Sequence, residues 1–300
     1  ARRARVEAGE AAGLGWILSL VSSREVPALA AAGPPVIHLT DATPGFLADF
    51  YARPVAPERF DVEARAIAAA ARVVYSSGHM AERAAREFGP AAAAKAVAIP
   101  FGANFDAPPA APPDKPALAP LRLLFVGKDW ARKGGDAALA ALDALAAAGV
   151  AAELTVAGCA PEAARGRADV RVMGFLDKNA PRDAARLAEA FARAHLLLLP
   201  TRADCTPMVI AEANAHATPV LVTETGGIPS LMDAGVNGRM LPAEADGAAW
   251  AAAVRAICAD PATHARFARG AFAHYRARLD WSAWARDMTA LLAGATESAA

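Results

Sequence analysis

Cysteine is scarce in this sequence of 300 residues, which contains only Cys159, Cys205 and Cys258 and no Cys-x-x-Cys pair. An odd number of widely spaced cysteines argues against both a disulfide framework and a zinc site. Surplus charge is also absent, because 31 Lys and Arg residues balance 31 Asp and Glu residues. Proteins that coat nucleic acid usually carry a basic excess. We therefore expect no nucleic-acid partner and no bound metal.

The sequence also lacks any uncharged apolar run of about 20 residues, the length that a membrane-spanning helix needs. It predicts at most peripheral membrane contact. The basic start, Ala1–Arg5, is followed closely by Glu7 and Glu10 and does not have the pattern of a secretory signal. An initiator Met is absent as well, which we interpret as loss of the true beginning. Together with the few cysteines, these features favour a cytoplasmic location.

Hydrophobic residues make up 55% of the chain, which is ample for buried cores. They form short apolar runs that alternate with longer Ala-, Leu- and Arg-rich segments, a pattern that indicates a parallel sheet covered by helices on both faces. The fold class is therefore α/β. The predicted strands are 16–21, 35–39, 72–76, 96–100, 121–127, 153–158, 170–174, 195–200 and 219–223. Examples of the predicted helices are 59–71, 79–88, 135–148, 182–194 and 208–216.

A proline-rich segment interrupts this alternation. Five prolines between Asp106 and Pro116 exclude a helix or an interior strand and predict a stiff linker. The predicted domains are a short first unit over residues 1–105, the linker over 106–119, a complete second unit over 120–278, and a final segment over 279–300. The final segment contains an apolar-striped helix that needs a surface to pack on.

Three cations, Lys128, Arg132 and Lys133, follow the predicted strand that ends at Gly127. A predicted helix begins after Gly134, and the exposed N–H groups and dipole at a helix N-terminus favour an anion. Two of the five lysines of the chain lie in this loop. We weigh a diphosphate clamp against an ordinary solvated basic loop. The spacing of a Walker loop is absent.

Two acidic residues accompany another strand-to-helix junction. Asp204 lies in the loop after the strand 195–200, and Glu212 lies about one turn inside the following helix. Thr206 is well suited to cap this helix. Because ligands of doubly wound sheets bind beyond the carboxyl ends of the strands, these carboxylates are placed to accept hydrogen bonds from sugar hydroxyls. The alternative interpretation is a helix cap plus a surface carboxylate.

Gly226 and Gly227 follow the strand 219–223 and let backbone N–H groups approach a ligand, although an ordinary tight turn is the better explanation for this segment on its own. In the first unit, Asp41 and Thr43 follow a strand end and are expected to face a cleft. His38 lies inside that strand and is interpreted as a packed core residue rather than a catalyst.

Taken in order along the chain, these segments resemble glycosyltransferase family 4, whose members have the GT-B architecture of two Rossmann-like domains. The resemblance covers nearly the whole chain and is strongest between residues 121 and 241. Family members carry Gly-Arg and then Lys-Gly after the first strand of the C-terminal domain, followed by two acids with seven residues between them. The matching positions are Gly127–Lys128, Lys133–Gly134, Asp204 with Glu212, Gly226–Pro229 and Gly235–Gly238.

The resemblance implies a retaining glycosyltransferase that takes its sugar from a nucleoside diphosphate donor. In such an enzyme Lys128 and Lys133 would hold the donor diphosphate, with help from Arg132. Asp204 would contact the donor sugar, so that Lys128, Lys133 and Asp204 form the predicted catalytic set. Glu212 would accept hydrogen bonds from the ribose hydroxyls.

Backbone groups supply the remaining donor contacts that the resemblance implies. The segment around Phe175 would meet the nucleotide base, Gly226 and Gly227 would lie near the donor, and Gly127 and Gly134 belong to the same donor-binding set. No metal or other cofactor is obligatory, because cationic side chains and a helix N-terminus offset charge on the departing diphosphate. The acceptor would be a hydroxyl of a carbohydrate, a lipid-linked compound or a small molecule.

The sequence departs from the family pattern at several positions. Lys128 stands where Arg is usual, Asp204 replaces Glu, and Pro207 has no N–H to donate to the sugar. These changes leave the identity of the donor open. Family members also begin with a Gly-rich loop after their first strand, which is not visible here, so we expect an incomplete N-terminal domain. The final helix, from Trp281, would cross back to that domain.

Two other functions remain open. The chain is a non-catalytic nucleotide-sugar-binding module if the incomplete first domain and the altered sugar contacts prevent transfer. It is another GT-B enzyme, such as a sugar-nucleotide epimerase or a phosphorylase, if the same donor pocket serves different chemistry. The two acids together with the two lysines favour the transferase.

Overall fold

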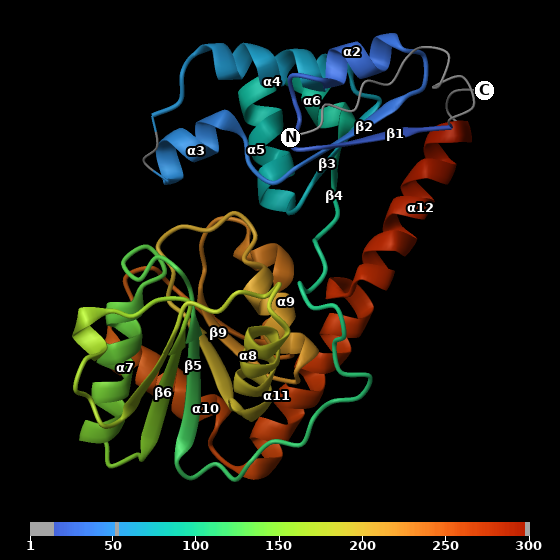
Figure 1. The fold of residues 1–300 in the computed structure, drawn as a ribbon. Coiled ribbons are helices and arrows are strands. Elements are labelled where there is room, and N and C mark those ends of the chain that lie inside the picture. Colours follow the sequence, from blue (N-terminus) through green and yellow to red (C-terminus); the bar gives the residue numbers. More distant parts are fainter. Residues whose placement is uncertain (1–14, 52–53, 298–300) are drawn as a thin grey trace. The chain divides into compact units, whose positions relative to one another are not determined.

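The computed structural model describes residues 15–51 and 54–297. The chain divides into two compact units, residues 1–100 and 101–300. Each unit is built from a parallel sheet with helices packed on it (Figure 1). The fold class is therefore α/β, with two Rossmann-like units, as predicted.

The first unit contains a four-stranded parallel sheet in the order β1-β2-β3-β4. Every residue of β2 is buried, which explains its almost continuous apolar sequence, because strands of a parallel sheet are covered on both faces. The strands are β1 (Ile17–Leu20), β2 (Val36–Thr40), β3 (Arg72–Tyr75) and β4 (Ala96–Ala98). The helices are α2 (Val26–Ala31), α3 (Pro44–Phe50), α4 (Glu58–Ala69), α5 (Gly78–Phe88) and α6 (Pro90–Lys95).

The second unit contains a six-stranded parallel sheet in the order β10-β9-β8-β5-β6-β7. Its strands are β5 (Leu121–Val126), β6 (Ala152–Ala157), β7 (Val170–Gly174), β8 (Leu196–Leu199), β9 (Val220–Thr223) and β10 (Gly238–Leu241). Its α-helices are α7 (Gly135–Ala147), α8 (Pro181–Arg193), α9 (Met208–Ala215), α10 (Gly247–Ile257), α11 (Pro261–His274) and α12 (Trp281–Glu297). Short 3₁₀ helices lie at Glu162–Ala164 and Ile228–Leu231, and a π-helical segment lies at Tyr275–Leu279.

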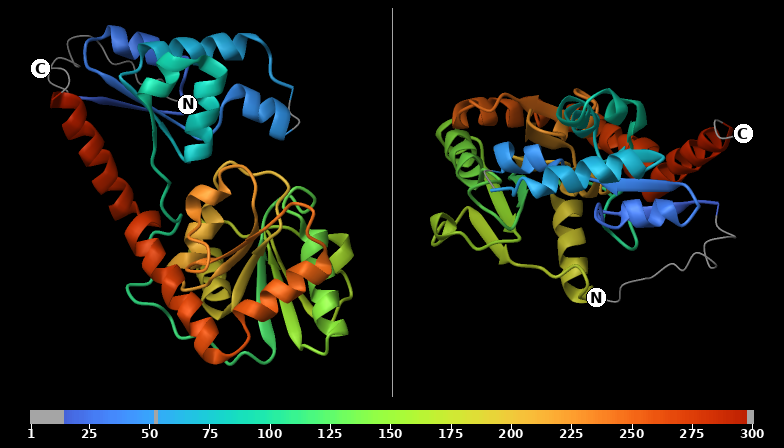
Figure 2. Two further views of the ribbon diagram at one scale, coloured as in Figure 1. Left: turned by 180° about the vertical axis from the view of Figure 1, so that it is seen from behind. Right: turned by 90° about the horizontal axis from the view of Figure 1, so that it is seen from above.

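Two hydrophobic cores cover the two faces of the second sheet. Side chains alternate along β5, so that Leu123 and Phe125 pack with α7 and α10, whereas Leu124 packs with α8 and α9. Figures 1 and 2 show these helix pairs on opposite faces of the sheet. Each fully buried leucine stabilises the fold by roughly 2 kcal/mol. The two cores hold the strand ends in fixed positions, which in turn fixes the loops that follow them.

All nine predicted strands are present, and the first and last residues of each lie within two residues of the predicted ones. The predicted helices 59–71, 79–88, 135–148, 182–194 and 208–216 are present as α4, α5, α7, α8 and α9. The sequence indicates five strands in the second unit, and the structure adds β10. This strand is only four residues long, begins with Gly238 and includes the exposed Arg239, so it lacks a continuous apolar run.

The proline-rich segment 106–119 contains neither helix nor strand, as predicted. It nevertheless forms hydrogen bonds with other parts of the second unit through Lys115. The Lys115 ammonium donates to the carbonyl oxygens of Phe191 at 3.1 Å and Ala192 at 3.0 Å, and to Thr218 Oγ1 at 2.7 Å. Burial lowers the pKa of Lys115 to about 7. The segment therefore contributes a packed side chain to the second unit and is more than a spacer.

Helix α12 begins at Trp281, whose indole Nε1 donates to the carbonyl oxygen of Ala103 at 2.9 Å. The Trp281 ring also stacks on Phe101, with ring centres 6.5 Å apart. The start of the helix is thus held by the second unit, and the expected crossing to the first domain stays a prediction. Within residues 15–51 and 54–297, no helix has both the length and the apolar character needed to cross a membrane.

Candidate donor-binding site

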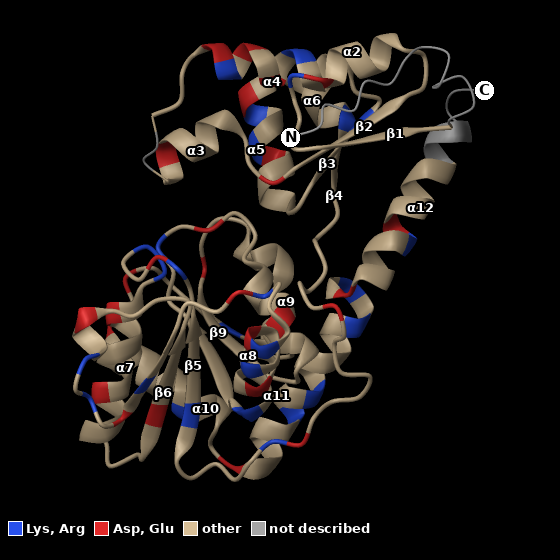
Figure 3. Ribbon diagram, in the orientation of Figure 1, with Lys and Arg blue, Asp and Glu red and all other residues tan. Residues whose placement is uncertain are grey.

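Three neighbouring strands place the predicted site residues at one end of the second sheet. The order β9-β8-β5 puts the loop after β5 beside the loop after β8, and the loop after β9 follows on the other side. The chain also reverses its strand order between β8 and β5, where ligands of open α/β sheets bind. Figure 3 shows both signs of charge on the loops that follow these strands.

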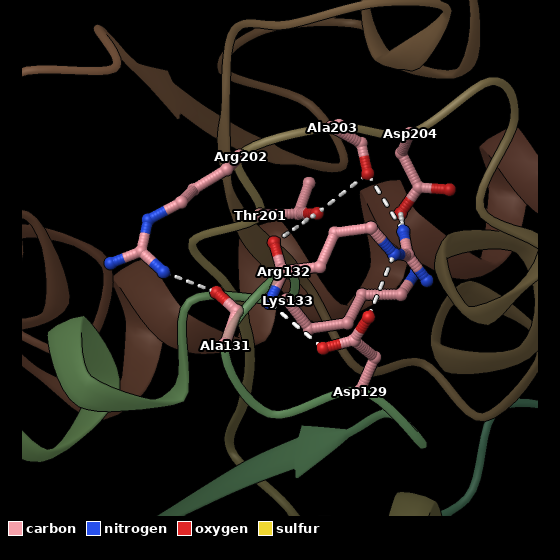
Figure 4. Close-up of polar contacts among 8 residues, drawn as sticks. All are labelled: Asp129, Ala131, Arg132, Lys133, Thr201, Arg202, Ala203 and Asp204. Carbon is pink, nitrogen blue, oxygen red and sulfur yellow. Dashed lines mark hydrogen bonds and ion pairs between the residues drawn. The ribbon is translucent and has the colours of Figure 1, made fainter. Parts of the chain in front are cut away.

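Backbone contacts join the loop after β5 to the loop after β8 (Figure 4). Arg132 Nη1 donates to the carbonyl oxygen of Ala203 at 2.8 Å, and the Arg202 N–H donates to the Arg132 carbonyl oxygen at 2.8 Å. Thr201 Oγ1 donates to the same Arg132 oxygen at 3.2 Å. Arg132 is therefore a structural link between the loops as well as a cation at the site.

Lys133 and Asp204 form an ion pair across these two loops (Figure 4). Both side chains are largely buried, with 13% of Lys133 and 9% of Asp204 exposed. Arg132 Nη1 lies 3.9 Å from Asp204 Oδ2 and adds a second, weaker interaction. The structure thus brings together the predicted cation and the first predicted acid.

The glycines at the start of α7 allow two neighbouring groups to approach the backbone closely. A Cβ atom on Gly134 would lie 1.8 Å from the carbonyl oxygen of Pro200, and one on Gly135 would lie 2.1 Å from the Trp130 ring. The N–H groups of Gly134 and Gly135 donate to the carbonyl oxygens of Ala131 and Trp130. Both glycines thus permit close packing at the start of α7, and the part of Gly134 in binding a donor stays a prediction.

The glycine turn after β9 meets the same region. The Gly227 N–H donates to the Asp204 carbonyl oxygen at 3.2 Å. Gly226 has φ of 53°, a left-handed conformation that glycine adopts without strain. The turn thus positions the backbone of Asp204, and both predicted glycines lie beside the ion pair of Lys133.

A cavity of about 220 Å³ lies next to these loops. Lys128, Phe175 and Glu212 all line it, and the Lys128 ammonium lies 4.9 Å from the centre of the Phe175 ring. Gly127 and Gly158 also line the cavity, where a Cβ atom on Gly158 would lie 2.7 Å from the Gly127 carbonyl oxygen. Predicted site residues that follow β5, follow β7 or lie on α9 therefore share one cavity.

Glu212 is the buried carboxylate of this cavity, with 2% of the residue exposed. It accepts a hydrogen bond from the ammonium of Lys178, a residue that sequence reasoning did not include. Burial raises the pKa of Glu212, and Lys178, the backbone N–H of Asn104 and the charge of Lys133 oppose this rise. The only signals for Lys178 in the sequence are the rarity of lysine and its place shortly after a strand end.

A larger cavity of about 370 Å³ lies elsewhere, on the sheet beside α8. None of the predicted site residues lines it. Several of its arginines already pair with acids: Arg122 Nε lies 3.1 Å from Glu153, and Arg193 Nη1 lies 3.8 Å from Glu189. We therefore place the candidate site in the smaller cavity, where a buried acid, two lysines and an aromatic ring converge.

The candidates in the first unit are structural. Thr43 is fully buried; its hydroxyl accepts from the Phe46 N–H at 3.2 Å, as the N-cap of α3, and donates to Glu87 at 2.6 Å. The expectation that Thr43 faces a cleft is therefore wrong, whereas Asp41 is exposed. His38 is buried in the core, as interpreted from the sequence.

Two further sequence expectations concern caps and metal ligands. The helix α9 begins at Met208 with Pro207 at its N-cap and no side-chain capping bond, so the proposed Thr206 cap is wrong. In the part of the chain that the structure describes, no group of three or more His, Cys, Asp or Glu side chains is arranged to hold a metal ion.

Comparisons with known proteins address the second unit most directly. Residues 120–260 match the family model described as glycosyl transferases group 1. The D-inositol 3-phosphate glycosyltransferase of Xylanimonas cellulosilytica is 30% identical over 251 residues, which cover 78% of this chain and 60% of that protein. The glycogen synthase of Mycobacterium tuberculosis is 31% identical over 176 residues, which cover 56% of this chain and 41% of that protein. The chain thus spans less than two thirds of the length of these relatives.

Solved structures share the fold of both units. Sucrose-phosphate synthase from Thermosynechococcus elongatus has a TM-score of 0.68 at 20% identity, covering 95% of this chain and 75% of that chain. Alr3699/HepE from Anabaena, solved in complex with UDP, has a TM-score of 0.69 at 17% identity, covering 96% of this chain and 80% of that chain. At such identities the likeness shows the fold, which is GT-B.

Proposed function

We propose that this chain, whose residues 120–260 match the family model of the glycosyl transferases group 1, transfers a sugar from a nucleoside diphosphate donor to a hydroxyl acceptor with retention of anomeric configuration. The observation that supports this most is the convergence of two acid–lysine pairs at one end of the second sheet. Lys133 pairs with Asp204, and Lys178 pairs with Glu212. Such a site offers cations to a diphosphate and carboxylates to sugar and ribose hydroxyls.

The donor diphosphate binds between the loop after β5 and the start of α7. Lys133 is its principal cation, because its ammonium is held beside the helix start by Asp204. Lys128 is exposed and adds a second positive charge from the rim of the cavity. As the bond between sugar and phosphate breaks, negative charge grows on the departing diphosphate, and these fixed cations and the helix dipole stabilise it. The reaction uses no obligatory metal or other cofactor.

The nucleoside occupies the cavity of about 220 Å³. The base lies against the backbone near Phe175, and Glu212 accepts hydrogen bonds from the ribose hydroxyls. Asp204 accepts from a hydroxyl of the donor sugar, since a diphosphate on Lys133 lies next to its carboxylate. HepE was solved with UDP and with UDP-glucose, which makes uridine diphosphate sugars the first donors to test.

The acceptor is a hydroxyl of a carbohydrate, a lipid-linked compound or a small molecule, and the reaction takes place in the cytoplasm. Zero formal net charge supports a small or neutral acceptor over nucleic acid. The chain covers 60% of the length of the D-inositol 3-phosphate glycosyltransferase described above. The acceptor side of this proposal is therefore the part to be tested with the full-length gene.

A Lys133→Ala substitution tests the diphosphate clamp. We expect calorimetric titration with UDP to show affinity lowered about thirtyfold or more, because a charge-assisted contact with the β-phosphate is lost. Lys95→Ala is the matched control, since Lys95 lies in the first unit and donates to the carbonyl oxygens of Ile67 and Ala68. Equal UDP affinity in the two variants would count against the clamp.

A glycosyl-release assay on the full-length gene product distinguishes transfer from binding alone. The product of a retaining transferase keeps the anomeric configuration of the donor, which nuclear magnetic resonance of the glycoside formed with the acceptor reports. Binding of UDP without any release or transfer would identify a non-catalytic nucleotide-sugar-binding module. Interconversion of the donor sugar itself would identify an epimerase.

A further inference from the structure

Lys178 lies in a loop that is ordered by its own hydrogen bonds. The loop connects β7 to α8, and the Asp177 N–H donates to Asp183 Oδ2 on α8 at 3.2 Å. Asp177 Oδ1 in turn accepts from the backbone N–H of Asn179 at 2.9 Å and from its side-chain amide at 3.0 Å. These contacts flank Lys178 on both sides and fix the direction from which its side chain enters the cavity.

The Lys178 ammonium lies close to two groups, one of which, Glu212, lines the cavity. It donates to Glu212 Oε1 and lies 5.6 Å from the centre of the Phe105 ring. The Glu212 side chain is 3% exposed, whereas that of Lys178 is 31% exposed. A buried carboxylate is costly unless a cation and hydrogen bonds compensate it. Lys178 supplies this compensation from the solvent side of the acid.

Other charged and titratable groups face Glu212 from each neighbouring element. The charge of Lys133 acts on it from the loop before α7, and the Asn104 N–H donates to it from the segment before the linker. On α9, His216 Nδ1 lies 2.9 Å from the Glu212 carbonyl oxygen, and burial lowers the pKa of His216. Lys178 is therefore the cation in direct contact with the Glu212 carboxylate among the described residues.

We propose that Lys178 is a positioning residue for nucleotide binding, which acts through Glu212 to hold that carboxylate ready for the ribose diol. The proposal rests on the proposed donor site, because it gives the nucleoside the same cavity. Among the described lining residues of this cavity, Glu212 is the sole carboxylate. A carboxylate accepts two short charge-assisted hydrogen bonds from neighbouring hydroxyls, whereas a protonated carboxyl has one acceptor fewer.

The charge state of Glu212 gives this role a measurable signature. Burial raises the pKa of Glu212 and Lys178 opposes the rise, so Lys178→Met raises this pKa further. At a given low pH, Glu212 of the variant is therefore protonated to a greater extent than in the unaltered chain, and the variant loses the carboxylate that the diol requires. Its UDP affinity falls as the pH decreases and recovers as the pH increases.

Calorimetric titration with UDP between about pH 5.5 and 8.5 tests the proposal. We expect Lys178→Met to weaken UDP binding about tenfold near pH 6 and clearly less near pH 8, while Lys178→Arg stays within about threefold of the unaltered chain. Lys95→Met, a matched change on the first unit, should follow the unaltered chain at every pH. Because Lys178 lies on a partly exposed loop, far-ultraviolet circular dichroism should show that both variants are folded.

Titration with 2′-deoxy-UDP shows whether the loss of UDP affinity in Lys178→Met depends on the ribose 2′-hydroxyl. The unaltered chain should prefer UDP to 2′-deoxy-UDP, and Lys178→Met should reduce this preference. Equal UDP affinity of Lys178→Met and the unaltered chain at every pH would overturn the role of Lys178. A loss that is the same at every pH and leaves the preference for UDP intact would show direct contact with the nucleotide, and would also overturn it. If neither the unaltered chain nor Lys95→Met binds UDP, GDP or ADP, the proposed function itself fails.

Discussion

Two buried carboxylates, one in each unit, are held in different ways. Glu63 on α4 is 6% exposed, accepts from Ser23 Oγ at 2.6 Å, and lies 3.5 Å from His38 Nε2. Glu212 on α9 is 2% exposed and contacts the ammonium of Lys178. Glu63 thus lies within a packed cluster of small polar groups, whereas Glu212 lies on the wall of a cavity beside a permanent cation.

The difference shows how a buried acid serves folding in one place and binding in another. The hydroxyl and imidazole that hold Glu63 come from the loop after β1 and from β2, so the contact ties α4 to the sheet. The lysine that holds Glu212 comes from a loop and is partly exposed, so a ligand can share the carboxylate without unfolding the helix. Of these two buried acids, the one that lines a cavity is the one that pairs with a lysine.

The largest effect is expected for Glu212→Ala, which removes the carboxylate at the cavity. We expect UDP affinity to fall about a hundredfold, because both hydrogen bonds from the ribose diol lose their charged acceptor. Stability should change little, since the Lys178 side chain is already 31% exposed and can be hydrated. Isothermal titration calorimetry and a urea titration measure the two effects. A large loss of stability with unchanged UDP affinity would place Glu212 in the same class as Glu63.

Glu63→Ala should have the opposite pattern. We expect the free energy of unfolding of the first unit to fall by about 2 kcal/mol, because Ser23 and the buried His38 lose their acidic partner. UDP affinity should not change. Urea unfolding measures the stability, with Glu82→Ala as the control, since the Glu82 side chain is 73% exposed. Equal midpoints for the two variants would remove the structural role of Glu63.

The sequence predicts the strands and the convergence of the site well, for one physical reason. Short apolar runs between helices are typical of buried parallel strands, and parallel strands present their following loops at the same edge. Lys133 and Asp204 are 71 residues apart in the chain, and they meet because β5 and β8 are neighbours in the sheet. Strand order cannot be read from spacing, so the family resemblance supplied this pairing in advance.

Other features depend on tertiary contacts that no local pattern contains. The partner of Glu212 could not be predicted, because Lys178 reaches it from the loop before α8, 34 residues away. Gly134 has the pattern of an anion-binding turn, but its sequence does not show that the Pro200 carbonyl oxygen occupies the space beside it. Thr206 has good capping chemistry, yet the helix begins after Pro207. The first two cases depend on groups that are distant in the sequence.

The smallest effect is expected for a buried histidine of the second unit, His195. His195 accepts the Arg122 N–H on Nδ1 at 2.9 Å, and its Nε2 lies 3.1 Å from the Pro116 carbonyl oxygen, which requires the neutral ring with its proton on Nε2. Burial lowers the pKa of His195 to about 4. A second proton would turn the Nδ1 acceptor into a donor facing another donor, so this contact with the Arg122 N–H requires the neutral ring.

Linkage gives the sign of the resulting pH dependence. The unfolded histidine has a pKa of about 6.5 and the folded one a pKa of about 4, so between these values the unfolded state binds more protons. Stability from His195 is therefore complete above about pH 6.5 and is lost as the pH falls toward 4. His195→Asn keeps an acceptor for the Arg122 N–H and should flatten the fall in melting temperature between about pH 6.5 and 5. An unaltered slope would mean that protonation of His195 does not contribute to the pH dependence of stability in this range.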